Sequence, residues 1–170
     1  SVSIVSAMDG PEAFCARATE SGFDGLIIPD CPPEESAGLI AAAKEHGLSL
    51  SLLVSPSTPP ERAREIASAS TGFVYMLARS GITGERDQAP EIGPRVRELR
   101  ETTDRPIACG FGIGTPQHVR AVVEHADAAI VGSALVRRLR DAHERGEDAV
   151  EVGERFVREL ASGLHAEASA

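Results

Sequence analysis

Two short apolar runs near the C-terminal end of the chain each stop at a glycine and lead into a helix signal. The first is Ala108–Ile113, with the letters ACGFGI, and the second is Ala126–Ala134, with the letters ADAAIVGSA. Apolar runs of this length are typical of strands buried on both faces of a parallel sheet. A terminal glycine lets the chain turn sharply and bring bare backbone N–H groups close to an anion. The pair therefore predicts two consecutive strand–helix turns suited to an anion.

The second turn carries the stronger signal, because Gly132 precedes Ser133–Leu135, the first turn of a predicted helix. A helix N-terminus has unpaired N–H groups and a partial positive charge, and both favour a phosphate. Glycine turns on the last two strands are where (β/α)8 barrels commonly hold phosphate. The alternative is that these glycines only make tight turns.

The rest of the chain alternates between apolar runs typical of buried strands and runs typical of helices. The predicted strands cover residues 24–28, 48–54, 72–77, 106–109 and 127–131, with a partial strand at 2–5. The predicted helices cover approximately residues 11–21, 34–46, 59–70, 90–100, 115–124 and 133–136, with a final helix over 149–160. This alternation predicts parallel strands joined by crossover helices.

Several local expectations accompany this pattern. Thr115 is expected to be the N-cap of the helix after it, and the segment 55–58 to cap the helix that follows. The polar stretch 137–148 is expected to lie outside the helices. The five histidines fall on or at the ends of predicted helices and are expected at the surface: His46, His118, His125, His143 and His165.

The fold predicted from these features is α/β, and two architectures compete. A full (β/α)8 barrel usually needs about 250 residues, so roughly 80 residues are expected before Ser1 on this interpretation. An open doubly wound sheet fits the length better. It does not explain the paired glycine turns, and no GxGxxG motif follows a first strand. We therefore expect a partial (β/α)8 barrel.

Composition excludes several classes of function. With 17 basic and 26 acidic residues, the net charge is −9, which argues against general nucleic-acid binding. No apolar run reaches membrane-spanning length and no stretch resembles a signal peptide, so we expect a cytoplasmic protein with no membrane association. The three cysteines are odd in number and lack ligand spacing, which predicts a reduced setting and no metal site.

Five features resemble the tryptophan synthase α subunit family in order and spacing. They are FDGLIIPDCPPEE at 23–35, Tyr75, SGITG at 80–84, CGFGI at 109–113 and IVGSAL at 130–135. Together they are specific, although several phosphate-binding barrels share the last two. The resemblance implies a ribulose-phosphate-binding type of (β/α)8 TIM barrel, lacking the first two to two and a half βα units. Residues 1–163 would form strand 3 to helix 8, and 164–170 a frayed tail.

The family's function follows as an expectation from this resemblance. It implies a lyase of tryptophan biosynthesis that cleaves indole-3-glycerol phosphate to indole and glyceraldehyde 3-phosphate by a retro-aldol reaction. In the family the indole passes to a β subunit that uses pyridoxal phosphate (PLP). The resemblance therefore implies a β-subunit partner and no cofactor in this chain.

The resemblance also assigns roles to individual residues. The substrate phosphate would meet the backbone of Gly84, Gly112, Gly132 and Ser133. The indole pocket and its lid would include Tyr75, Phe111 and Thr83, and the surface that faces the β subunit would include Asp30 and Pro32. The alternatives are a core aromatic for Phe111, an interior barrel residue for Tyr75 and a loop tip for Thr83. For Asp30 the alternative is an N-cap of the helix from Pro33 onward.

The resemblance places the family's catalytic Glu and Asp upstream of Ser1, so no catalytic residue is expected in this chain. The family's Tyr-x-Asn is also replaced, by Val2-Ser-Ile4. We therefore expect the 170 residues to be inactive alone, and unpaired strand edges to favour self-association.

Two rival functions remain open at this stage. One is another phosphate-binding barrel enzyme, such as a relative of indole-glycerol-phosphate synthase, phosphoribosyl-anthranilate isomerase or thiamine-phosphate synthase. The other is a noncatalytic module that binds a β-type PLP partner, which the acidic composition and the Asp30–Pro32 loop would suit.

Overall fold

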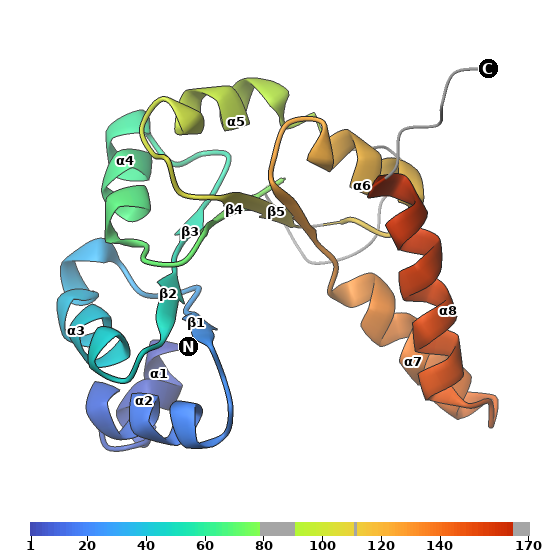
Figure 1. Cartoon of the computed structure of the whole chain (residues 1–170), viewed down its shortest axis with the longest axis horizontal. Helices are drawn as coiled ribbons and strands as arrows, with labels where there is room; N and C mark the ends of the chain where they lie inside the picture. Colours follow the sequence, from blue (N-terminus) through green and yellow to red (C-terminus); the bar gives the residue numbers. More distant parts are fainter. Residues whose placement is uncertain (79–90, 111, 165–170) are drawn as a thin grey trace. The chain divides into compact units, whose positions relative to one another are not determined.

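The computed structural model describes residues 1–78, 91–110 and 112–164 (Figure 1). The chain forms two compact units. Unit 1 comprises Ser1–Met76 and Glu98–Ile107, and unit 2 comprises Leu77–Arg97 and Ala108–Ala170. In both units short strands alternate with helices, as the hydrophobic pattern predicts.

Unit 1 contains the first strands and helices of the chain. Its elements are α1 (Val2–Ala7), α2 (Pro11–Glu20), β1 (Gly25–Ile27), the 3-10 turn η1 (Pro33–Glu35), α3 (Ala37–Glu45), β2 (Ser49–Ser51), β3 (Leu53–Val54) and α4 (Pro60–Ala69). The unit boundaries fall within β4 (Val74–Leu77), α5 (Gly93–Arg100) and β5 (Ile107–Gly110). Unit 2 continues with α6 (Pro116–Val123), β6 (Ala128–Ile130), α7 (Ser133–Glu144), α8 (Ala149–Ala161) and the 3-10 turn η2 (Ser162–Leu164).

Parallel pairing joins strands that follow one another along the chain. In unit 1, β1 pairs with β2 (Gly25↔Ser49 to Ile27↔Ser51) and β3 with β4 (Leu53↔Tyr75, Val54↔Met76). In unit 2, β5 pairs with β6 (Ala108↔Ala128, Cys109↔Ala129, Gly110↔Ile130). Because α3, α4 and α6 connect these pairs, each connection is a strand–helix–strand crossover. The predicted α/β class with parallel strands is confirmed.

The core of each unit is formed by its strands together with residues beside them and on the helices. Leu50, Leu52, Val54, Val74 and Met76 are fully buried in unit 1, and Cys109 and Val122 in unit 2. Apolar residues on both faces of a strand are typical of a parallel sheet covered by helices, and the continuous apolar runs from residue 24 onward coincide with β1 to β6. The predicted strand 48–54 is divided at Leu52 into β2 and β3.

The predicted partial strand at 2–5 is wrong, because Val2–Ala7 forms the helix α1. The Met8 backbone N–H donates to the carbonyls of Ile4 and Val5 at 3.1 and 3.2 Å, and Val5 is the buried residue of the helix. A strand has to find a neighbouring strand for its backbone hydrogen bonds, whereas a helix closes them within itself. A four-residue apolar run cannot distinguish the two outcomes.

The expectation for residues 137–148 is wrong over 137–144, because α7 continues to Glu144. Its polar residues form an exposed face, on which Arg140 and Glu144 lie 3.6 Å apart one turn from each other. The opposite side contacts α8, and the Arg138 guanidinium lies 4.7 Å from the centre of the Phe156 ring. Only four residues, 145–148, separate α7 from α8.

One of the two helix caps predicted from the sequence is present in the structure. The Thr115 hydroxyl accepts a hydrogen bond from the His118 N–H at 3.2 Å and caps α6 as predicted. The segment 55–58 does not cap α4, whose N-cap is Pro59 with no side-chain bond. Instead the Ser55 and Thr58 hydroxyls lie 2.9 Å apart and hydrogen-bond each other.

Membrane-spanning helices are absent from the part of the chain that the structure describes, since no helix there is both long and apolar enough.

Gly163 and Leu164, which the sequence places at or next to a frayed tail, belong to η2. Residues 165–170 lie outside the described residues.

Gly25 tests the register of the first strand pair. A methyl group added there would lie 2.9 Å from the Ser49 carbonyl oxygen and would also meet the Ser49 hydroxyl. We expect Gly25→Ala to lower the free energy of unfolding by about 1–3 kcal/mol, measured by urea denaturation. Gly38→Ala is the control, because its methyl meets nothing within 4 Å on α3, and it should be neutral or stabilise by up to about 1 kcal/mol. Equal unfolding free energies in the two variants would contradict the β1–β2 register.

Candidate functional site

The register of β5 and β6 places the two glycine turns of the sequence side by side. Gly110 pairs with Ile130, so Gly112 and Gly132 each stand two residues beyond the same register pair. Neighbouring parallel strands lie about 4.8 Å apart, and their carboxyl ends leave a sheet at the same edge. The pairing therefore places the turns of Gly112 and of Gly132 and Ser133 at the same edge of unit 2.

Gly112 has a backbone conformation that requires glycine. Its φ of 75° is left-handed, a region that residues with a side chain rarely adopt. The turn continues through the buried Ile113 and Gly114 to the cap of α6 at Thr115. At this position the local backbone alone explains the glycine.

Gly132 does not have the left-handed conformation of Gly112. It is the N-cap of α7 with a φ of −117°, and a methyl group added there would meet nothing within 4 Å. Both Gly132 and the following Ser133 are exposed. Folding therefore leaves room for a side chain at this position, and a ligand that approaches the backbone would require the space to stay empty.

The first turn of α7 supplies hydrogen-bond donors to this space. The first backbone N–H groups of a helix have no partner within it, and the N-cap of α7 makes no side-chain hydrogen bond. The N-caps of α6 and α8, Thr115 and Asp148, do accept such bonds. The partial positive charge of a helix N-terminus adds about 0.3–1 kcal/mol for an exposed anion, and up to about 2 kcal/mol when partly buried. Binding a phosphate therefore requires several converging N–H groups.

The other predicted site residues are distributed between unit 1 and the undescribed segments. Tyr75, on β4, is half-buried opposite Leu53 of β3 in unit 1, where Asp30 and Pro32 also lie. Thr83, Gly84 and Phe111 lie outside the described residues. The roles predicted for all of these residues stay predictions.

Asp30 does not cap the turn that follows it, so the alternative role as its N-cap is wrong. The N-cap of η1 is Pro32, and it has no side-chain bond. The Asp30 carboxylate instead accepts hydrogen bonds from the Ser1 hydroxyl at 2.8 Å and from the Val2 N–H at 2.9 Å. These hydrogen bonds hold the pKa of the Asp30 carboxyl below its ordinary value, and the bond from Ser1 has the largest effect.

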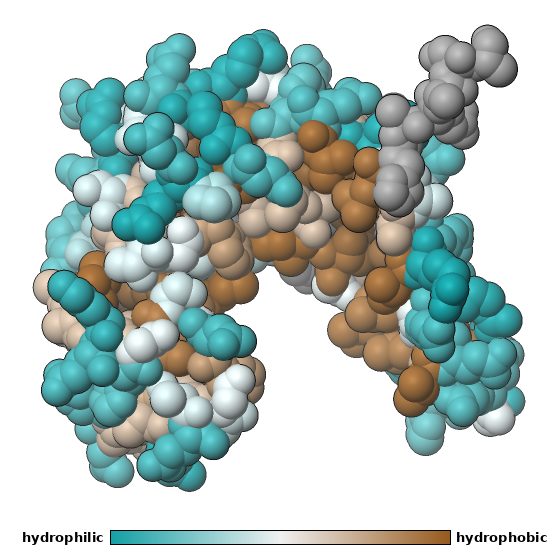
Figure 2. Space-filling model, viewed as in Figure 1, coloured by the Kyte–Doolittle hydropathy of each residue, from teal (hydrophilic) through white to brown (hydrophobic). Residues whose placement is uncertain are grey.

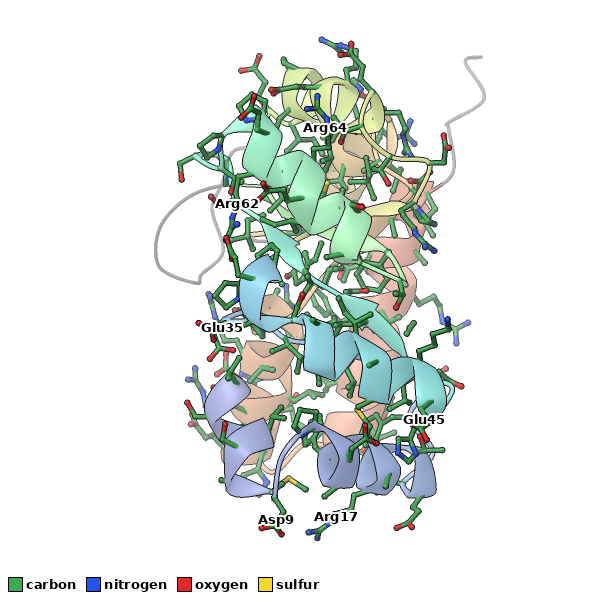
Figure 3. All side chains as sticks on the ribbon, turned by 90° about the vertical axis from the view of Figure 1, so that its left-hand side faces the viewer. Asp9, Arg17, Glu35, Glu45, Arg62 and Arg64 are labelled. Atoms are coloured by element: carbon green, nitrogen blue, oxygen red, sulfur yellow. The ribbon has the colours of Figure 1, made fainter. Side chains whose placement is uncertain are left out.

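An ion pair connects η1, which directly follows the loop of Asp30 and Pro32, to the helix α4. Both terminal guanidinium nitrogens of Arg62, on α4, contact the Glu34 carboxylate of η1, and the Nη2–Oε2 distance is 2.6 Å. Arg62 also donates to Glu65 at 2.9 Å. Figure 3 shows the labelled side chains of Arg62 on α4 and of Glu35 on η1 at the surface of unit 1. The Arg62 hydrogen bond lowers the pKa of Glu34 to about 2.

His118 is the residue at this site that sequence analysis misplaced. It was expected at the surface, but only 3% of it is exposed, and its Nδ1 accepts a hydrogen bond from the Gly114 N–H at 3.4 Å. Its position three residues after the N-cap was the available signal, because side chains there often bond back to the backbone before the helix.

An apolar groove of about 240 Å³ lies between α6, β6, α7, α8 and η2, and Figure 2 shows apolar surface along α7. The groove is lined by valine, alanine and leucine residues, which give a phosphate no polar side chain. No cluster of three or more metal-ligating side chains occurs in residues 1–78, 91–110 and 112–164. The glycine turns are therefore the candidate site.

Sequence comparison places the chain among known proteins. It matches the family model described as tryptophan synthase alpha chain over residues 4–165. A tryptophan synthase alpha chain from Picosynechococcus sp. is 47% identical over 132 residues, which is 76% of this chain and 50% of the relative. One from Thermosynechococcus vestitus is 46% identical over 137 residues, with coverages of 78% and 50%. The chain thus spans about half the length of the curated relatives it matches.

Solved structures show the same likeness. A tryptophan synthase alpha chain from Legionella pneumophila superposes with a TM-score of 0.82 at 29% identity, covering 96% of this chain and 60% of that one. A structure of the tryptophan synthase α2β2 complex from Pyrococcus furiosus gives a TM-score of 0.78 at 33% identity, with coverages of 90% and 61%. The predicted fold class, a partial (β/α)8 barrel, is confirmed.

The Glu34–Arg62 pair makes a prediction that NMR can test. Because the pKa of Glu34 is about 2 in the folded chain and 4.5 ordinarily, the pair stabilises the fold above pH 4.5. That contribution is lost as the pH falls through about 2. The carboxyl carbon of Glu34 should titrate near pH 2 in the wild type and close to its ordinary value in Arg62→Gln. An unchanged titration in the variant would show that Arg62 does not hold the carboxylate.

Proposed function

The chain belongs to the tryptophan synthase alpha chain family, and from that premise we propose that it binds the phosphate end of indole-3-glycerol phosphate. The proposed activity of the whole protein is that of a lyase, which cleaves this substrate to indole and glyceraldehyde 3-phosphate. The observation that carries the proposal is the Gly110↔Ile130 pair, because it aligns the turns at Gly112 and Gly132.

The proposed binding mode uses the main chain instead of cationic side chains. The N–H groups of Gly112, Gly132 and Ser133 donate to the phosphate oxygens, and the N-terminus of α7 adds its partial positive charge. A chain with a net charge of −9 repels a dianion at long range, so short-range donors have to provide the affinity. Gly84 is proposed as a fourth donor.

The indole end of the substrate is assigned to side chains further from the turns. We place Phe111 against the indole ring and Tyr75 at the substrate with its ring and hydroxyl. Thr83 is proposed to close over the site as part of a lid. Burying the ring against aromatic side chains would distinguish this substrate from a phosphoribosyl compound, which lacks an indole.

The partner proposed for this chain is a β subunit that holds PLP, and no cofactor is assigned to the chain itself. The loop with Asp30 and Pro32 would face that partner. Support comes from the contacts of the loop, through Glu34 and Arg62 to α4 and through Asp30 to the start of α1. A loop held in one conformation loses less entropy when it binds.

Gly132→Ala separates binding from folding at the proposed site. We expect the variant to bind inorganic phosphate about tenfold more weakly, because its methyl group would occupy the space next to the amide donors. Its melting temperature should stay close to that of the wild type, since the methyl group meets no other atom within 4 Å. Calorimetric titration measures the affinity, and Gly38→Ala is again the matched control.

The same titration decides the substrate class. Indolepropanol phosphate should bind more tightly than a phosphoribosyl ligand to the wild-type chain, and both should weaken in Gly132→Ala. Equal affinity of Gly132→Ala and the wild type for inorganic phosphate would contradict the proposed site. Preference for the phosphoribosyl ligand would favour another phosphate-binding barrel enzyme.

A further inference from the structure

We propose that His118 is a positioning residue, which holds the turn carrying Gly112 in the conformation that binds phosphate. This inference rests on the proposed function and adds to it a side chain that need not touch the substrate. It assigns the buried imidazole on α6 a task in the site rather than in the core alone.

Two hydrogen bonds connect His118 to the residues before its helix. The Gly114 N–H donates to His118 Nδ1 at 3.4 Å, and the backbone N–H of His118 donates to the Thr115 hydroxyl at 3.2 Å. The first bond joins the side chain to the turn, and the second is the cap of α6. The whole residue is 3% exposed, so water has little access to replace the bond to Gly114.

The arrangement resembles a capping box shifted by one residue. In a capping box the side chain of the third helical residue accepts from the N–H of the N-cap, here Thr115. His118 instead accepts from Gly114, one position earlier, and so orients the peptide group between Ile113 and Gly114. Because Nδ1 accepts a hydrogen bond there, the ring proton of a neutral imidazole lies on Nε2.

This peptide group lies next to the left-handed glycine of the turn. Gly112, with a φ of 75°, is separated from Gly114 only by Ile113, which is buried. Glycine allows many backbone conformations, so the turn needs contacts elsewhere to select one of them. The bond from Gly114 to the imidazole supplies such a contact, and the direction of the Gly112 amide depends on it.

The test compares three variants of the full chain by titration with inorganic phosphate and by amide NMR. His118→Leu keeps a side chain of apolar bulk but removes the acceptor. His118→Gln keeps an acceptor of the type that capping boxes use. Thr115→Val removes the neighbouring cap of the same helix but leaves the imidazole in place.

We expect His118→Leu to weaken phosphate binding about tenfold and to accelerate hydrogen exchange of the Gly114 amide. His118→Gln should restore the affinity to within about threefold of the wild type. Thr115→Val should lower the melting temperature because it removes the cap of α6, with phosphate affinity close to the wild type. A role in stability alone would instead lower affinity in step with melting temperature in both variants.

Two results would overturn the inference, and they can be told apart. If phosphate shifts the amides of Gly132 and Ser133 equally in the wild type and in His118→Leu, the proposed function survives and the role of His118 does not. If phosphate leaves these amides unchanged in the wild type, the proposed function fails and the inference fails with it.

Discussion

The parallel pairing of β5 with β6 is the interaction on which the candidate site depends. The pair of Gly110 with Ile130 sets both strand ends at one level, so two turns that are 20 residues apart in sequence become neighbours. A shift of the register by one residue would separate Gly112 from Gly132 along the sheet and reverse the faces of the side chains. The site is thus a consequence of the core, because the burial of apolar residues such as Cys109 helps to fix the register.

Glycine stands at the two positions of this edge for different physical reasons. Gly112 is required by its left-handed backbone, whereas Gly132 stands at an open helix start with room for a side chain. The proposed ligand would explain the second glycine, since an anion bound there has to approach the amide groups closely. The buried His118 supports the first turn through Gly114, so that the donors are held in place before a ligand arrives. Such preorganisation matters most in an acidic protein that binds an anion through its main chain.

Most of the fold could be predicted from sequence because its strands are apolar on both faces and its helices have clear ends. Thr115 and the glycine turns were identified for this reason. The errors have physical causes. At Val2–Ala7 a short apolar run fits a helix as well as a strand, and α7 was cut short because its exposed face is polar. The bond between His118 and Gly114 depends on burial and side-chain direction, which a spacing pattern does not show.

The central claim is that backbone amides at the ends of β5 and β6 converge on a phosphate. The most direct test of this convergence is a crystal structure of the chain with glycerol 3-phosphate. The account predicts that the phosphate group lies within hydrogen-bond distance of the N–H groups of Gly112, Gly132 and Ser133. A phosphate bound elsewhere on a well-occupied site, with these three amides facing only solvent, would contradict it.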